Sequence, residues 1–310
     1  MNIIPIVFCF DDRLILPAGV CITSLLEHAR PDTFYDIFIL HASSCSYPST
    51  GYLERLNERY VNFKINYRNV GTVFSDAFEI RNITVAAYYR LMIPDVISEY
   101  DKVMYHDVDV IFREDLSELF NSTDMSNYYV GGVSFTGGLQ KQERAYLSKL
   151  QLNWQEYILS GNLILNLSLL RKDNIVMQFK KEVERSKYRY QDMDIINIVC
   201  KGKIKRLPPV FCGTIEIFEL ASKQQRQSLY SPAELAAVLQ IGIVHYNGPK
   251  PWNTYCPNMD LWWEYYRNSL YYDPQFYFEF FYLKLDEYDR LPLLKRVKIL
   301  ARYFLKGRLK

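Results

Sequence analysis

The sequence predicts an α/β protein with a mostly parallel central sheet flanked by helices. The apolar, β-branched runs that are typical of buried strands are residues 3–10, 35–42, 61–66, 102–106 and 129–133. Segments with helical spacing separate several of these runs, and strand–helix–strand alternation is typical of parallel sheets. In such sheets ligands bind at the carboxyl ends of the strands, so the residues that follow each run are the candidates for chemistry.

The first elements of this pattern are the clearest. Residues 3–10 form an apolar run that ends at an acidic pair, Asp11 and Asp12. Residues 16–28 follow with apolar side chains on one helical face after an early proline, and residues 52–60 show helical spacing before the third run. We therefore expect parallel first strands with helices between them.

Length and composition favour one large domain with a small appendage. The chain has 310 residues and 49% hydrophobic residues, enough to bury a substantial core. The composition of the chain changes after Trp252, and residues 262–282 are rich in aromatic side chains. We expect a main domain over residues 1–255 and an extension over residues 256–310. The aromatic segment is expected to pack against the core, and a sugar-stacking platform is the alternative.

The net charge of +2 hides an asymmetry, because basic residues without any acid crowd residues 290–310 while the rest of the chain is acidic overall. One helical face of this tail carries Leu293, Val297, Leu300 and Phe304. Another face carries Lys295, Lys298, Arg302 and Lys306. The pattern is typical of a helix that lies on an anionic membrane surface, and a terminal helix docked on the domain is the alternative. Nucleic acid is a poor partner, because the body is acidic and carries no nucleic-acid motif.

The sequence also predicts the compartment. It contains no run of about 18 apolar residues, and its first residues lack the features of a signal peptide. The six cysteines are scattered without a CxxC pair, so we expect free, mostly buried thiols rather than disulfides or a zinc site. Together these observations favour a cytoplasmic protein.

Asp107 and Asp109 lie two positions apart directly after the apolar run 102–106. An extended or tightly turned backbone can present both carboxylates near one point, and hard divalent cations prefer such oxygens. The spacing alone is weak evidence, because about one match is expected by chance in a chain of this length. Asp192 and Asp194 form a second match, and a solvated turn is the alternative for either pair.

A second segment, IGIVHYNGPKPW, runs an apolar strand into His245. The imidazole can add a nitrogen ligand beside the two acids, which favours manganese or another first-row ion over magnesium. Gly248 allows the backbone to approach a phosphate, and Lys250 supplies a compact positive charge. An ordinary hydrogen-bonded histidine is the alternative, but the combination with Asp107 and Asp109 predicts a metal site.

Four parts of the sequence carry a family resemblance: IVFCFDDR, AAYYRLMIPD with KVMYHDVDVIF, SGNLILNLSLLRK with YQDMDIIN, and HYNGPKPW. In order and spacing they resemble bacterial glycosyltransferase family 8, which contains the lipooligosaccharide α-galactosyltransferases. The resemblance implies a GT-A fold over residues 1–255, in which a Rossmann-like nucleotide-binding half merges with an acceptor-binding half. It also implies retention of anomeric configuration, UDP-galactose or UDP-glucose as donor, a glycan acceptor, and Mn²⁺ with Mg²⁺ as the alternative.

The resemblance further implies roles for individual residues. The metal ligands are expected to be Asp107, Asp109 and His245. Nucleotide and diphosphate contacts are expected from Asp11, Arg13, Val108, Gly248 and Lys250. The donor sugar is expected to contact Arg90, Asp107, Ser160, Gly161 and Asp192. Catalytic roles are expected for Arg90, Asp192 and Lys250. From the residues alone, an exposed turn at Asp11 and Arg13 and an ion pair between Arg90 and Asp95 stay open as alternatives.

Three positions depart from the family pattern. Leu159 replaces an amide near the donor sugar, Met193 replaces a glutamine near the anomeric carbon, and Phe135 stands where a relative has an acceptor-side aspartate. Methionine cannot act as a nucleophile, so front-face substitution is expected, with Asp192 as the other possible nucleophile. A non-catalytic relative that binds a nucleotide sugar or a glycan is the alternative function.

Overall fold

The computed structural model describes residues 2–79, 84–224 and 227–305. The chain divides into two compact units, Met1–Asn247 and Gly248–Lys310. The first unit contains the central sheet, and the second contains the helices α10, α11 and α12.

A seven-stranded sheet in the order β3-β2-β1-β4-β7-β6-β8 forms the centre of the first unit. Its strands are β1 (Asn2–Cys9), β2 (Thr33–His41), β3 (Phe63–Asn69), β4 (Lys102–His106), β6 (Val130–Ser134), β7 (Ile158–Asn166) and β8 (Ile204–Arg206). Strand β7 runs antiparallel to β4 and β6, and the other neighbours are parallel. The predicted α/β class with a mostly parallel sheet is therefore confirmed.

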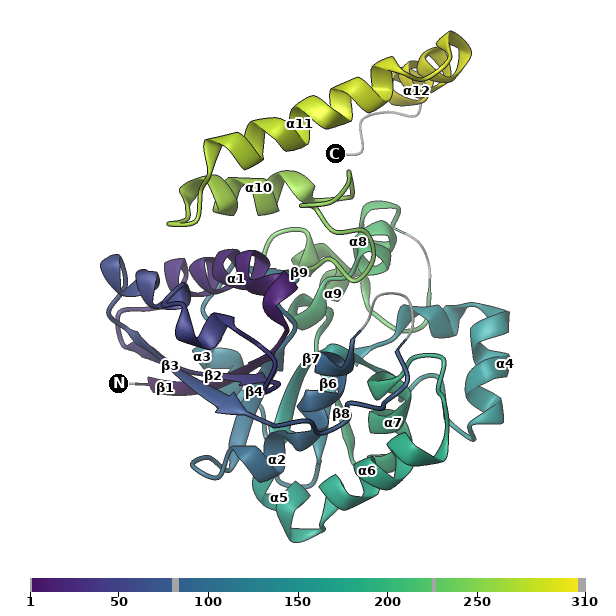
Figure 1. Ribbon diagram of the computed structural model, residues 1–310. Coiled ribbons are helices and arrows are strands. Elements are labelled where there is room, and N and C mark those ends of the chain that lie inside the picture. Colours follow the sequence, from purple (N-terminus) through teal and green to yellow (C-terminus); the bar gives the residue numbers. More distant parts are fainter. Residues whose placement is uncertain (1, 80–83, 225–226, 306–310) are drawn as a thin grey trace. The chain divides into compact units, whose positions relative to one another are not determined.

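Helices cover both faces of this sheet, which explains why strands such as β1 read as nearly continuous apolar runs. Figure 1 shows α1 (Ile15–Glu27) on one side and α2 (Ile93–Val96), α5 (Leu167–Lys172) and α6 (Ile175–Arg185) on the other. The remaining α-helices of the unit are α3 (Ser117–Ser122), α4 (Lys141–Lys149), α7 (Asp192–Val199), α8 (Ile215–Ser222) and α9 (Pro232–Val238). Its 3-10 helices are η1 (Asp12–Leu14), η2 (Tyr47–Ser49), η3 (Leu53–Glu58), η4 (Val85–Met92), η5 (Thr136–Leu139) and η6 (Pro209–Cys212).

Two predicted elements differ in detail from the structure. The segment 52–60 contains the 3-10 helix η3 rather than an α-helix. Strand β3 begins at Phe63 rather than Val61, whose side chain is 91% exposed. The polar and small residues Ser160 and Gly161 interrupt the apolar pattern of β7, so this fully buried strand is not among the predicted runs.

A second, two-stranded sheet positions the candidate site. Strand β5 (Val110–Phe112) pairs antiparallel with β9 (Ile243–His245), in a register that places Val110 opposite His245. Because β5 follows β4 after only three residues, this pairing carries a segment from far along the sequence to the carboxyl end of β4.

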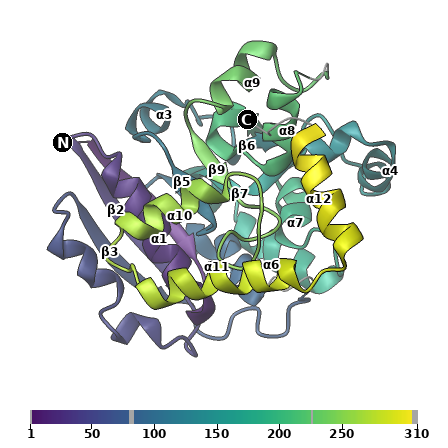
Figure 2. The same cartoon turned by 90° about the horizontal axis from the view of Figure 1, so that it is seen from above.

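The second unit consists of α10 (Met259–Asn268), α11 (Pro274–Asp289) and α12 (Leu293–Leu305), and Figure 2 shows α12 turning away from the axis of α11. Its aromatic residues pack on one another. The rings of Trp262 and Tyr266 are stacked with centroids 5.4 Å apart, and Trp263 contacts Phe280 at 4.6 Å. Trp262, Trp263 and Tyr266 are buried, so they serve packing rather than an exposed platform. Within the described residues, no helix is long and apolar enough to span a bilayer.

Candidate active site

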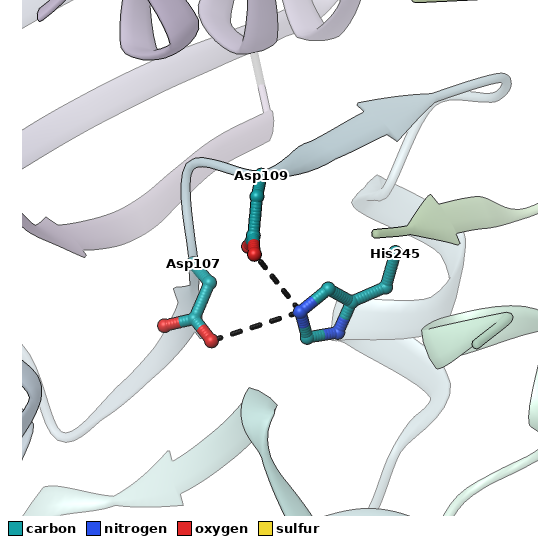
Figure 3. Close-up of side chains that lie close together, drawn as sticks. All are labelled: Asp107, Asp109 and His245. Carbon is teal, nitrogen blue, oxygen red and sulfur yellow. Dashed lines mark ion pairs between the residues drawn. The ribbon is translucent and has the colours of Figure 1, made fainter. Parts of the chain in front are cut away.

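Asp107 and Asp109 lie on the short connection between β4 and β5. The backbone N–H of Asp107 donates to the carbonyl of Gly161 at 2.8 Å, which ties the end of β4 to β7. The N–H of Tyr246 donates to the carbonyl of Asp109 at 2.9 Å, which ties the start of β5 to the end of β9. As a result, the side chains of Asp107, Asp109 and His245 point toward one another (Figure 3).

These three side chains form a candidate metal site. His245 Nε2 lies 3.8 Å from Asp107 Oδ2 and 3.3 Å from Asp109 Oδ1, and one ligand atom from each residue lies within 4.8 Å of the others. Two carboxylates and one imidazole are a donor set that suits a first-row divalent ion. The space between them depends on Gly161, because an added Cβ would lie 2.3 Å from His245 Cε1 and 2.6 Å from Asp107 Oδ2. The residues present therefore fit a divalent cation.

Replacing Gly161 with alanine is expected to lower the affinity for Mn²⁺ by about 10-fold or more, since the methyl group occupies the space between the ligands. Electron paramagnetic resonance of free Mn²⁺ measures this affinity directly. Gly131→Ala is the matched control, because its added Cβ meets Leu207 and Met125 at ordinary contact distances of 3.4 Å. Equal Mn²⁺ binding by the two variants contradicts the assignment of the site.

The surroundings of His245 shift the pKa of its imidazole. Burial of His245 favours the neutral ring, but the charge of Asp109 and contacts with Asp109 and Cys212 outweigh it, so the pKa of His245 lies well above its ordinary value. Burial lowers the pKa of the neighbouring His106 to about 3, so this ring is neutral at physiological pH. His106 Nδ1 lies 2.7 Å from the side-chain oxygen of Asn162, on the strand opposite. Asn162 and Cys212 were not predicted from the sequence. Asn162 lies within the segment SGNLILNLSLLRK, but no spacing relates either residue to His245.

Arg90 links the candidate metal site to the expected sugar site. Its guanidinium donates to Asp107 Oδ1 at 2.8 Å and to the Ser160 carbonyl at 2.6 Å, and it lies 3.3 Å from Asp192 Oδ2. The side chain is only 6% exposed. Its carboxylate partners are thus Asp107 and Asp192, whereas Asp95 is exposed, and the alternative pairing is wrong.

Asp192 and Asp194, the second D-x-D pair of acids spaced two positions apart, lie in two different environments. Both acids lie in the first turn of α7, where residues two apart face different sides of the helix. Asp192 faces Arg90 and the Ser160 hydroxyl, and burial raises its pKa although both of these groups lower it. Asp194 accepts hydrogen bonds from the hydroxyls of Tyr146 at 2.6 Å and Tyr157 at 2.5 Å, so it supports the fold.

Asp11 follows β1, and β1 is the parallel neighbour of β4, so Asp11 and Asp107 lie at the same edge of the sheet. Asp11 accepts hydrogen bonds from Arg13 Nη2 at 2.8 Å and from the Thr84 hydroxyl at 3.1 Å. Burial raises the pKa of Asp11, but these hydrogen bonds and the charge of Arg13 outweigh it, and the net pKa is lowered. The side chain of Arg13 is 64% exposed, as expected if Asp11 and Arg13 form an exposed turn. The side chain of Asp11, in contrast, is partly buried.

Val108, Gly248 and Lys250 are the other residues expected to contact the nucleotide or its diphosphate. The side chain of Val108 is buried, so a contact to a nucleotide from this position involves its backbone. Gly248 and Lys250 begin the second unit, three and five positions after His245 along the chain. Their roles remain predictions from the sequence.

Residues 5–256 match glycosyl transferase family 8. The chain belongs to this family. One relative is a putative glycosyltransferase of Haemophilus influenzae, 32% identical over 184 residues, or 57% of this chain. The match covers 52% of that protein, so the chain corresponds to about half of its length. General stress protein A of Bacillus subtilis is 27% identical over 82% of this chain and 88% of its own length.

A solved structure supports the fold assignment to the GT-A class. The galactosyltransferase LgtC, in complex with donor and acceptor sugar analogues, is 26% identical to the chain, with a TM-score of 0.75. The alignment covers 88% of this chain and 98% of that one. The expected family and fold are thereby confirmed.

Proposed function

We propose that the protein is a retaining hexosyltransferase that moves galactose or glucose from a UDP-sugar to a glycan or lipooligosaccharide acceptor. One observation carries this proposal. Two acids and an imidazole from distant parts of the sequence converge at the carboxyl edge of the sheet, and Arg90 joins them to Asp192. Similarity to LgtC, whose structure contains donor and acceptor sugar analogues, supports the substrate class. We further propose residues 1–255 as the catalytic domain and residues 256–310 as an extension.

The proposed metal is Mn²⁺, with Mg²⁺ as the alternative, held by Asp107, Asp109 and His245. When bound, it supplies positive charge next to the diphosphate of the donor. Asp107 is oriented for this task by Arg90 and by the Tyr105 hydroxyl, which donates to its Oδ1 at 2.5 Å.

The nucleotide half of the donor is proposed to lie along the strand ends of β1 and β4. Asp11 and Arg13 contact the nucleoside, and the backbone at Val108 approaches the diphosphate. Gly248 allows a second close backbone approach, and Lys250 opposes the negative charge that grows on the departing diphosphate.

The sugar half of the donor is proposed to contact Arg90, Asp192, Ser160 and Gly161. The carboxylate of Asp192 is held by Arg90 and the Ser160 hydroxyl, which suits a group that orients sugar hydroxyls. Met193 offers no nucleophilic oxygen. We therefore favour front-face departure and attack through an oxocarbenium-like transition state, in which stabilisation of the leaving UDP contributes most of the rate.

A screen of UDP-hexoses for Mn²⁺-dependent release of UDP tests the proposed activity. We expect release from UDP-galactose or UDP-glucose, loss of release on chelation, and recovery when Mn²⁺ is added back. Binding of a UDP-sugar without turnover on any glycan would instead support the non-catalytic alternative. This alternative is considered because Leu159 and Met193 depart from the family pattern.

We also propose that residues 290–310 bring the enzyme to an anionic membrane surface. Most of the large apolar side chains that are exposed lie in the second unit, among them Leu293 at 73% and Leu294 at 84% exposure. The exposed Lys295 and Lys298 lie on the same helix, α12. The basic residues Lys306, Arg308 and Lys310 and the side chains of Arg302 and Phe304 lie outside the described residues. The cytoplasmic leaflet carries negative lipids, so we propose a cytoplasmic enzyme at the inner face of the plasma membrane.

The full-length protein is expected to co-sediment with vesicles that contain phosphatidylserine, and the chain ending at Asp289 is expected to lose this binding. Binding should weaken as salt is raised, because the basic residues contribute through electrostatics. Vesicles of neutral lipid are the control. Equal sedimentation of the two proteins with anionic vesicles rejects the membrane role of the tail.

A further inference from the structure

The backbone places a cysteine beside the candidate metal ligand His245. Helix η6 ends at Cys212, and the next residue forms an isolated parallel bridge to β9. In this bridge the N–H of Gly213 donates to the Ile243 carbonyl, and the N–H of His245 donates to the Gly213 carbonyl, both at 2.8 Å. A Cβ at position 213 would lie 2.7 Å from the Ile243 carbonyl oxygen, so only glycine permits this approach. Cys212 Sγ thereby lies 3.3 Å from His245 Nδ1, with its side chain fully buried.

Asn162 is the other side-chain neighbour of His245 Nδ1 in the described part of the chain, with its Nδ2 at 3.5 Å. The orientation of its amide follows from His106. That ring makes edge-on contacts with Phe112 and Phe211, each with a centroid distance of 5.1 Å, and its Nε2 has no hydrogen-bond partner among the described residues. A proton on Nε2 would be a buried donor without an acceptor, which is costly.

The His106 ring therefore carries a proton on Nδ1 and donates it to the Asn162 side-chain oxygen at 2.7 Å. This bond uses the acceptor end of the Asn162 amide. The amide NH₂ is consequently the end that faces His245, and an amide nitrogen donates hydrogen bonds but does not accept them.

Coordination of a cation through His245 Nε2 requires the ring proton to lie on Nδ1. That N–H needs an acceptor, and the Asn162 amide presents a donor. The Cys212 sulfur is the remaining neighbour, and a thiol can both donate and accept a hydrogen bond. We infer that Cys212 is a positioning residue, whose sulfur accepts the His245 Nδ1 hydrogen bond and holds the imidazole in the tautomer and orientation that coordinate a cation. This inference rests on the metal site of the proposed function.

Affinity for Mn²⁺ in the presence of UDP, measured by electron paramagnetic resonance on the full chain, tests this role. Removing a partner that orients a metal-bound histidine typically lowers affinity by about 10- to 100-fold, and we expect this loss in Cys212→Ala. Cys212→Ser is expected to keep most of the affinity, because a hydroxyl also accepts and donates. Cys200→Ala, which removes another buried thiol, is expected to bind like the wild type.

Cys212→Val keeps an apolar side chain of similar size, so the comparison of serine with valine decides the question if the alanine variant fails to fold. Wild-type affinity in the valine or alanine variant, or equal losses in the serine and valine variants, overturns the inference. Asp109→Ala separates the two proposals. If Asp109→Ala binds Mn²⁺ as the wild type does, the metal site of the proposed function fails and the role of Cys212 fails with it. If only Asp109→Ala loses binding, the metal site stands and Cys212 has no positioning role.

Discussion

Replacing Asp109 with alanine is expected to lower turnover by a factor of about 100 to 1,000, equivalent to about 3 to 4 kcal/mol of activation free energy. The carboxylate of Asp109 lies 3.3 Å from His245 Nε2 and is one of three groups that converge on the candidate metal site. Without it the donor set has one acid and one imidazole, and the charge that we propose opposes the departing UDP is no longer held in place. The loss should appear in kcat as well as in Mn²⁺ affinity.

A UDP-release assay with saturating Mn²⁺ and a productive acceptor measures this effect. Asp101→Ala is the matched control, because Asp101 directly precedes β4, whereas Asp107 and Asp109 follow it, and its side chain is 84% exposed. We expect the control to retain activity. Near-normal turnover by Asp109→Ala, with the protein folded, refutes the metal role of Asp109.

Much of the sheet could be predicted from the sequence, because several of its buried strands, such as β1 and β4, read as apolar runs. The apolar run 102–106 predicted β4, and Asp107 and Asp109, which follow this run, were expected to present their carboxylates near one point. The structure brings those two side chains together. The placement of His245 beside them depends on the pairing of β5 with β9. Such long-range pairing is not encoded in local periodicity, and the expectation came from the family resemblance together with the chemistry of the residues.

The parts that were missed depend on register and on close packing. Asn162 faces His106 because β4 and β7 pair in one register, and a shift by one residue would turn its side chain to the other face. Cys212 reaches His245 through a backbone approach that Gly213 permits. Neither contact leaves a signal in the spacing of residues along the chain, so the sequence alone could not identify them.

The two D-x-D pairs show why spacing needs a structural context. Asp107 and Asp109 lie on a short connection between two strands, where residues two apart can face the same point. Asp192 and Asp194 lie in the first turn of a helix, where the same spacing separates the side chains. Asp107 and Asp109 therefore belong to the candidate metal site, whereas Asp192 faces Arg90 and Asp194 accepts hydrogen bonds from two tyrosine hydroxyls.

Replacing Arg90 with methionine is expected to lower the free energy of unfolding by about 3 to 5 kcal/mol, because it leaves two carboxylates without their buried cation. The guanidinium contacts Asp107 and Asp192 and also donates to the Ser160 carbonyl, so no other single side chain replaces it. At about 2 to 4 °C per kcal/mol for a unit of this size, the melting temperature should fall by roughly 10 °C. Activity should be lost together with stability, since the same group contacts an acid of the candidate metal site and an acid of the proposed sugar site.

Thermal and urea unfolding of matched variants separate the charge effect from simple loss of packing. Arg90→Lys keeps the charge but cannot present a planar fork to both acids, so it should recover only part of the stability. Combining Arg90→Met with Asp192→Asn removes one of the stranded charges, and the double variant should therefore be more stable than the sum of the single losses predicts. Arg30→Met, which removes an exposed ion pair with Glu118, should change stability little. If Arg90→Met is no less stable than Arg30→Met, then the buried ion pairs do not hold this site together, and the roles of Arg90 and Asp192 in orienting the sugar lose their structural basis.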